Sequence, residues 1–177
     1  MEYQTLDSRE IYRNRWMSLR EDAIARPSGQ PGVYSVVEKN DFAVIAAVEG
    51  ADIWLVQQYR YPVAARFWEL PQGNCEDPTL PPLEVARREL REETGLQAEE
   101  MRHGGRLFLA YGFCTQAYDV YLASGLQQGE RDLEPEEEGL ICQRFALAEV
   151  EAMIVRGEIQ DASTIAALGL LRMKGWL

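Results

Sequence analysis

Residues 88–96 of the chain read Arg-Glu-Leu-Arg-Glu-Glu-Thr-Gly-Leu, and this segment says most about the fold. Its three carboxylates, Glu89, Glu92 and Glu93, stand at i, i+3 and i+4, which places them on one face of a helix. Like charges at this spacing destabilise a helix by about 0.2–0.5 kcal/mol per pair, so a cation is expected over them. Because the donors are oxygen atoms with neither His nor Cys beside them, the expected cation is Mg²⁺ or Mn²⁺, and such ions commonly bind substrate phosphates.

A solvated helix surface is the alternative interpretation, because Arg88 can pair with Glu92 one turn later. Plotted at about 100° per residue, however, the helix separates its side chains by type. Leu83, Ala86 and Leu90 form an apolar stripe, with the arginines on one side of it and the acids on the other. This segregation favours a metal-binding face over a mixed, solvated one.

The segment before the helix predicts a strand and a turn. Residues 67–70, Phe-Trp-Glu-Leu, are largely apolar, and residues 71–74, Pro-Gln-Gly-Asn, are typical of a chain reversal. The Pro81-Pro82 pair predicts the start of the helix, and Gly95 predicts its C-terminal cap. In such a strand-loop-helix unit, loop carbonyls can complete a metal shell that the helix begins.

These residues resemble the signature box of the Nudix hydrolases, which cleave nucleoside diphosphates linked to another moiety. Gly73 together with residues 88–96 matches the second half of that box at every fixed position. Three outer segments, around Arg60, at residues 68–71 and at residues 157–162, resemble the branch of the family that acts on ADP-ribose and related nucleotide sugars. The resemblance covers nearly the whole chain.

The first half of the box departs from the family pattern. A Glu is expected six residues after the Gly and eight before the Arg, but Thr79 and Leu80 stand at those two places because the connection is one residue longer. Glu76 and Glu84 are the nearest glutamates. The departure concerns the loop and leaves the acids of the helix in place.

The resemblance implies which residues hold the metal and do the chemistry. Glu89, Glu93 and Glu92 are the predicted metal ligands, with the backbone carbonyl of Gln72, and Glu92 is also counted among the catalytic residues. Two substrate-binding residues follow as well. Arg60 is expected to hold the phosphate or ribose of the substrate and Glu69 a hydroxyl, although both could be ordinary charges on a strand surface.

A second acidic group lies at residues 134–138, which read Glu-Pro-Glu-Glu-Glu between two predicted strands. Such a run is by itself most simply a solvated loop. In the nucleotide-sugar branch, an acidic loop at a similar place supplies a Glu that binds a metal or orients the attacking water. The resemblance therefore implies Glu136 and Glu138 as catalytic candidates, with Glu138 preferred because it directly precedes Gly139.

The pattern of apolar residues predicts one α/β domain over residues 1–177, and the resemblance implies that N-terminal strands in about residues 1–40 form a dimer. The fold implied is the Nudix fold, a mixed β-sheet sandwiched between α-helices. Relatives in this branch are commonly dimers that exchange N-terminal strands, so a homodimer is expected by resemblance. Strands are predicted at 16–24, 32–37, 42–48, 53–59, 105–110, 117–123 and 139–145, and helices at 147–156 and 162–173.

The composition of the chain limits the kinds of partner that it can bind. The 177 residues are 46% hydrophobic, enough for a proper core, and the net charge of −11 argues against a nucleic-acid surface. A small nucleoside diphosphate derivative remains compatible, because a bound metal reverses the local charge. No apolar run approaches the roughly 18 residues of a membrane span, and Met1 to Glu10 lack the apolar core of a secretion signal. Three unpaired cysteines, at 75, 114 and 142, fit reduced thiols, so cytoplasmic residence is expected.

Two competing hypotheses remain. A nucleotide-sugar sensor would keep the fold and bind ligand without turnover, and the altered first half of the box supports it. An RNA 5′ pyrophosphohydrolase would predict salt-sensitive RNA binding, which the acidic composition disfavours.

Overall fold

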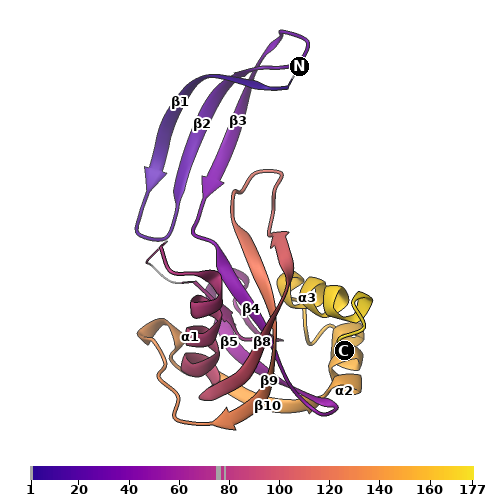
Figure 1. Cartoon of the computed structure of the whole chain (residues 1–177). Coiled ribbons are helices and arrows are strands. Elements are labelled where there is room, and N and C mark those ends of the chain that lie inside the picture. The colour runs from indigo at the N-terminus through magenta and orange to yellow at the C-terminus, as the bar shows by residue number, and fades with distance from the viewer. Residues whose placement is uncertain (1, 75–76, 78) are drawn as a thin grey trace. The chain divides into compact units, whose positions relative to one another are not determined.

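The computed structural model describes residues 2–74, 77 and 79–177, except for the side chain of Glu136. Within these residues the chain forms two compact units, each visible in Figure 1. The first unit comprises residues 1–41 and 107–118, and the second comprises residues 42–106 and 119–177. Glu76 and Cys75, two residues of interest in the sequence, lie outside the described residues.

The first unit holds a three-stranded antiparallel sheet in the order β1-β2-β3. Its strands are β1 (Gln4–Arg13), β2 (Ser18–Ala25) and β3 (Pro31–Glu38). The apolar pattern predicts β2 and β3 but not β1, whose sequence is polar and whose ten residues are all exposed. Pairing with β2 holds this strand, and an ion pair from Arg9 to Glu21 at 3.2 Å joins the two side chains.

The second unit contains the larger sheet, which is mixed and has seven strands within the described residues. Five of them follow the order β10-β5-β4-β9-β8, while β6 pairs with β5 and β7 pairs with β4. In chain order the strands are β4 (Phe42–Glu49), β5 (Asp52–Arg60), β6 (Ala65–Glu69), β7 (Gln72–Gly73), β8 (Leu96–Phe108), β9 (Ala117–Gln128) and β10 (Ile141–Ala146). The strand β8 begins well before the predicted 105–110, because its charged residues, which are common on edge strands, hide the apolar alternation that would predict it.

The helices of the second unit are α1 (Pro82–Thr94), α2 (Leu147–Arg156) and α3 (Ala162–Met173). Both predicted ends of α1 are confirmed. Pro82 is its first residue, where a missing N–H leaves no helical bond unmade. Gly95 follows the helix with a φ of 76° and donates its N–H to the Arg91 carbonyl at 2.8 Å. Two short 3₁₀ helices, η1 (Tyr61–Val63) and η2 (Pro135–Glu137), complete the description.

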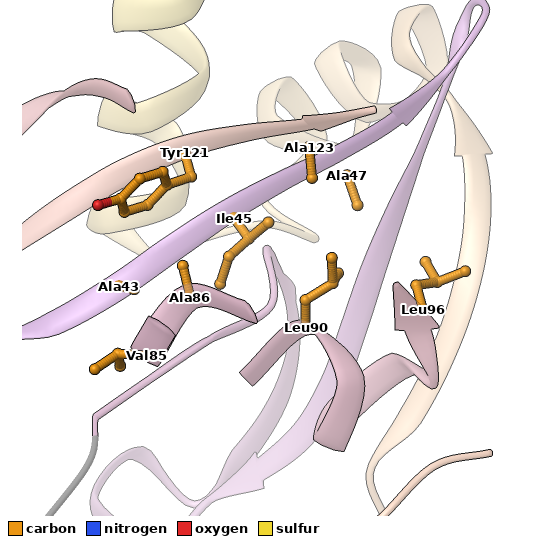
Figure 2. Close-up of a cluster of buried hydrophobic side chains, with 9 residues drawn as sticks. All are labelled: Ala43, Ile45, Ala47, Val85, Ala86, Leu90, Leu96, Tyr121 and Ala123. Carbon is orange, nitrogen blue, oxygen red and sulfur yellow. The ribbon is translucent and has the colours of Figure 1, made fainter. Parts of the chain in front are cut away.

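The central strand β4 separates two helical layers. Ala43, Ile45 and Ala47 alternate along it and pack with Leu90 of α1 and Tyr121 of β9 in a buried cluster (Figure 2). Side chains between them face the other way, and α3 contacts β4 from that opposite face (Figure 1). The predicted fold class, a mixed sheet between helices with additional N-terminal strands, is confirmed.

Candidate active site

Three carboxylates of α1 are buried although the helix is amphipathic. Val85, Ala86 and Leu90 fill the core, yet Glu89 and Glu92 keep only 6% of their surface exposed and Glu93 only 1%. Charged groups rarely lose water to this degree unless they are paired or bound to a metal. The burial rules out a merely solvated helix surface for these three positions.

Glu93 is the most buried of the three and is held by the preceding strand. Its Oε2 accepts a hydrogen bond from the backbone N–H of Gln72 at 2.9 Å. Burial raises the pKa of Glu93 well above its ordinary value, and the nearby charge of Glu89 raises it further. A single N–H donor does not offset the loss of water around a carboxylate.

Glu89 lies directly against the backbone of Gly73. A Cβ atom added at Gly73 would stand 2.6 Å from the Glu89 carboxyl carbon and closer still to one oxygen, so any larger residue would displace the acid. The φ of Gly73 is not in the left-handed region, so backbone conformation does not require a glycine here. The reason for the glycine is the close approach of the Glu89 carboxylate to its backbone. Burial, followed by the charges of Glu92 and Glu137, raises the pKa of Glu89 to about 8.

Glu92 differs from its two neighbours because it is paired. Arg88 donates to Glu92 Oε1 at 2.8 Å across one helical turn, as the alternative interpretation of the sequence expected. The same guanidinium reaches Glu134 Oε1 at 3.0 Å. Arg88 thus ties the helix to the acidic loop at residues 134–138.

The acidic loop begins with η2, which closes on itself. Glu137 Oε2 accepts the backbone N–H of Glu134 at 2.9 Å, forming a capping box. Burial raises the pKa of Glu137, and its charge acts on both Glu89 and Glu93. Arg131 anchors the chain before the loop by donating to the Glu93 carbonyl at 2.8 Å.

The catalytic candidates of this loop occupy different environments. Glu138 is exposed, and the side chain of Glu136 lies outside the described residues. Glu137 was not singled out by the sequence, yet its charge acts on both Glu89 and Glu93, whereas that of Glu134 acts on Glu89. Only the turn conformation distinguishes three consecutive glutamates, so no signal in the sequence separates them.

The predicted substrate residues Arg60 and Glu69 form an ion pair at 2.5 Å. The Glu69 side chain keeps 4% exposure against 42% for Arg60, and both of its oxygens have partners. Gln58 also donates to Oε1 at 3.2 Å, and the Gln72 amide donates to Oε2 at 3.1 Å. Burial raises the pKa of Glu69, an effect opposed by Arg60. The substrate roles of both residues stay predictions.

The altered first half of the box is only partly described. Thr79 donates its N–H and hydroxyl to Asp77 Oδ1 at 2.9 and 2.6 Å, so this position makes a turn. Glu84 lies exposed in the first turn of α1. Neither Thr79 nor Glu84 therefore takes the place of the expected acid beside Glu89 and Glu93.

The donors suit a hard divalent cation. Among the described residues, no three His, Cys, Asp or Glu side chains are already gathered closely enough to hold a metal. Glu89 and Glu93 nevertheless repel each other in a buried place, and both lie against the Gln72-Gly73 backbone. Oxygen donors of this kind, from carboxylates and a carbonyl, are those that Mg²⁺ or Mn²⁺ takes. A divalent cation would offset the repulsion among neighbouring carboxylates that, after burial, raises both pKa values.

Comparison with known proteins identifies the family. Residues 39–168 match the NUDIX domain model, and residues 3–37 match the model of the nucleoside diphosphate sugar hydrolase N-terminal domain. The chain therefore belongs to the Nudix family. It is a Nudix hydrolase similar to ADP-ribose pyrophosphatases, and enzymes of this family generally use divalent metal ions.

Several relatives are similar over most of their length. An ADP-ribose pyrophosphatase of Mycobacterium tuberculosis is 34% identical over 94% of this chain and 82% of its own length. An ADP-ribose pyrophosphatase of Bacillus subtilis is 26% identical over 98% and 95%. A methanol dehydrogenase activator of Bacillus methanolicus is 29% identical over 98% and 94%. A crystal structure of an ADP compounds hydrolase shares the fold, with a TM-score of 0.88 at 21% identity over 100% of this chain and 98% of that one.

None of the helices of the described residues combines the length and the hydropathy needed to cross a lipid bilayer.

Proposed function

We propose that this hydrolase cleaves the diphosphate of a nucleoside diphosphate sugar such as ADP-ribose, with Mg²⁺ or Mn²⁺, to a nucleoside monophosphate and a sugar phosphate. The observation that carries the proposal is the buried pair Glu89 and Glu93 against the Gln72-Gly73 backbone, with pKa values raised by burial and by the charges of neighbouring carboxylates. The names of two relatives and the matched N-terminal model support the substrate class.

The metal would be held by Glu89, Glu93 and Glu92 with the backbone carbonyl of Gln72. When bound, it would neutralise the diphosphate charge and lower the pKa of a coordinated water. Glu92 lies on the same face of α1 as the other two acids, and its ion pair with Arg88 holds its carboxylate in place.

A carboxylate of the loop at residues 134–138 would accept the proton of the attacking water. Glu138 and Glu136 are the residues that the resemblance implies, and Glu137 joins them because its charge acts on Glu89 and Glu93. A raised pKa suits a proton acceptor that works near neutral pH. Burial gives Glu137 this property, since it raises the pKa of that carboxyl.

Arg60 is the proposed anchor for the substrate. Its side chain is 42% exposed and uses Nη2 for Glu69, so other N–H groups of the guanidinium remain to donate to phosphate or ribose oxygens. Glu69 would act on the substrate through Arg60 or by accepting from a hydroxyl.

A homodimer is proposed as the working form. The strand β1 is exposed throughout, and large apolar side chains gather on the first unit. These exposed side chains include Tyr3, Leu6, Ile11, Tyr12, Val33 and Tyr34. Apolar side chains gathered on a surface are typical of an interface. Residence in the cytoplasm stays a prediction.

The test is release of monophosphate from ADP-ribose, followed by chromatography with Mg²⁺ and then Mn²⁺, alongside other nucleotide sugars. We expect AMP and ribose phosphate from the wild-type protein and their loss in Glu93→Gln. Glu84→Gln is the matched control, because Glu84 lies on the same helix but is exposed. Equal turnover in all three proteins would refute the assigned site.

A second candidate, a nucleotide-sugar sensor, is favoured by the relative named as a methanol dehydrogenase activator. The buried acids of α1 favour an enzyme that turns over its substrate, whereas the altered first half of the signature box favours the sensor. Binding of ADP-ribose in calorimetry without any monophosphate after prolonged incubation with metal would select the sensor.

A further inference from the structure

Gln72 is the junction between the acidic helix and the start of α3. Its backbone N–H donates to Glu93, while its side-chain Nε2 donates to Glu69 Oε2 and to Asp161 Oδ2, each at 3.1 Å. The side-chain oxygen of Gln72 is the partner of the Ser163 hydroxyl at 2.7 Å. Gln72 therefore connects the carboxylates of Glu69 and Asp161 to that of Glu93 on α1.

The orientation of the Gln72 amide is determined by its neighbours. Two carboxylates can only accept hydrogen bonds, so the NH₂ group must face Glu69 and Asp161. Its oxygen then faces Ser163, whose single proton can go either to this oxygen or to Asp161 Oδ2 at 2.6 Å. Reversing the amide would place its oxygen against two acids, which is unfavourable.

The first turn of α3 is itself fixed to the end of β6. Asp161 is the N-cap and accepts the Thr164 N–H at 2.7 Å. The Thr164 hydroxyl accepts the Leu70 N–H at 2.9 Å, directly before Pro71 and Gln72. Ser163 and Thr164 are both buried, so this turn is a rigid support. Although burial opposes it, hydrogen bonds from Ser163, Thr164 and Gln72 lower the pKa of Asp161.

We infer that Asp161 and Ser163 are positioning residues: they hold the Gln72 side chain, and through it they fix the Gln72-Gly73 backbone against Glu93 and Glu89. The inference rests on the proposed function of that acidic site and adds two residues of α3 and its N-cap whose hydrogen bonds reach that site through Gln72. Partners one step removed from metal ligands commonly change metal affinity or activity when they are lost. The first turn of α3 is thus part of the support of the active site.

The test measures Mn²⁺ affinity by electron paramagnetic resonance of the free ion, with kcat and KM for ADP-ribose measured in parallel. In Ser163→Ala we expect Mn²⁺ affinity to fall about 10-fold, and kcat to fall likewise with little change in KM. Ser163→Thr keeps the hydroxyl and should restore both. Asp161→Asn can keep an oxygen at the position of Oδ2, which accepts from Gln72, Ser163 and Thr164, and should therefore stay close to the wild-type protein. Gln160→Ala, at an exposed neighbouring position, is the control.

A double-mutant cycle decides whether the support acts through Gln72. In a Gln72→Leu background, Ser163→Ala should have no further effect on Mn²⁺ affinity, because the connection is already absent. Independent effects that add, or a lower unfolding temperature with unchanged Mn²⁺ affinity and kcat, would overturn the inference. Because Mn²⁺ binding needs no substrate, a wild-type protein that binds Mn²⁺ without turnover would defeat the proposed function and leave this test intact.

Discussion

The acidic face of α1 and the sheet of β1–β3 distribute their residues in opposite ways. In the first region, Glu89, Glu92 and Glu93 are ionisable and buried, whereas in the second, Tyr3 and Tyr12 are aromatic and exposed. Stability alone favours the reverse in both places, because charges lose hydration on burial and apolar surface gains from it. We infer that each region is arranged for a partner, a cation in the first and an apolar protein surface in the second.

The strongest challenge to this comparison is Glu93→Gln. We expect kcat/KM for ADP-ribose to fall about 1,000-fold. Losing one ligand of the proposed divalent cation would remove several kcal/mol of transition-state stabilisation. The melting temperature in a chelator should stay equal or rise, since the amide replaces a buried ionisable group and can still accept the Gln72 N–H. Normal activity in this variant would show that the buried carboxyl of Glu93 is not needed for catalysis.

Gly73→Ala should have the next largest effect. The added Cβ would meet the Glu89 carboxyl group, so the acid must move away from the backbone. A displacement of about 1 Å at a reacting centre lowers rates by about 100-fold. Gly169→Ala is the matched control, because a Cβ there has no atom within 4 Å and the position is helical. Similar kcat values for the two variants would argue against close approach at Gly73.

The pH dependence of stability sharpens the electrostatic half of the comparison. The carboxyl of Glu89 has an ordinary pKa of 4.5, but its folded-state pKa is raised to about 8. Between these values the folded state keeps a proton that the unfolded state has lost, so protons stabilise the fold and stability decreases as pH rises. Below about pH 4.5 this contribution is complete, and above pH 8 it is lost.

In a chelator, we therefore expect the midpoint of thermal unfolding to be lower at pH 8 than at pH 6. A change on the order of 2 kcal/mol corresponds to about 5 °C for a domain of this size. Mg²⁺ should remove most of the difference, and Glu89→Gln should flatten the profile without metal. An unchanged slope in that variant would assign the dependence to other groups.

The smallest effect on the stability of a single chain is expected on the exposed sheet. Leu6→Ser and Tyr12→Ser should change the free energy of unfolding of a monomer by less than about 0.5 kcal/mol, because both side chains are exposed. Light scattering after size exclusion should instead show a shift from dimer to monomer. Lys39→Ser, also exposed and next to β3, is the control. An unchanged mass in all variants would show that the exposed apolar side chains of the β1–β3 sheet do not bind a second copy of the chain.

Local patterns were sufficient for much of the fold. The spacing of Leu83, Ala86 and Leu90 predicts α1, and Pro82 and Gly95 mark its ends, because capping depends on residues close in the chain. The apolar pattern did not predict β1, because its exposed, largely polar residues show no buried face. Pairing with β2 is what makes this segment a strand. The same holds for most of β8, at the sheet edge.

The site divides in the same way. Helical spacing alone places Glu89, Glu92 and Glu93 on one face, which the structure confirms by burying all three. The nearness of Glu137 to this face depends on the conformation of η2, and three adjacent glutamates look alike in a sequence. The contact of Gly73 with Glu89 and the connection from Gln72 to Asp161 also join residues distant in the chain.

The order of residues by itself therefore determined the acidic helix, its caps and the membership of the family, because each depends on spacings within a few turns of one element. The tertiary structure alone decided which carboxylates lose water, which loop acid acts on them, and that the first turn of α3 supports Gln72. Burial and charge interactions depend on distance in space, and folding brings together groups far apart in the chain, such as Gln72 and Asp161 at 89 positions and Leu70 and Thr164 at 94.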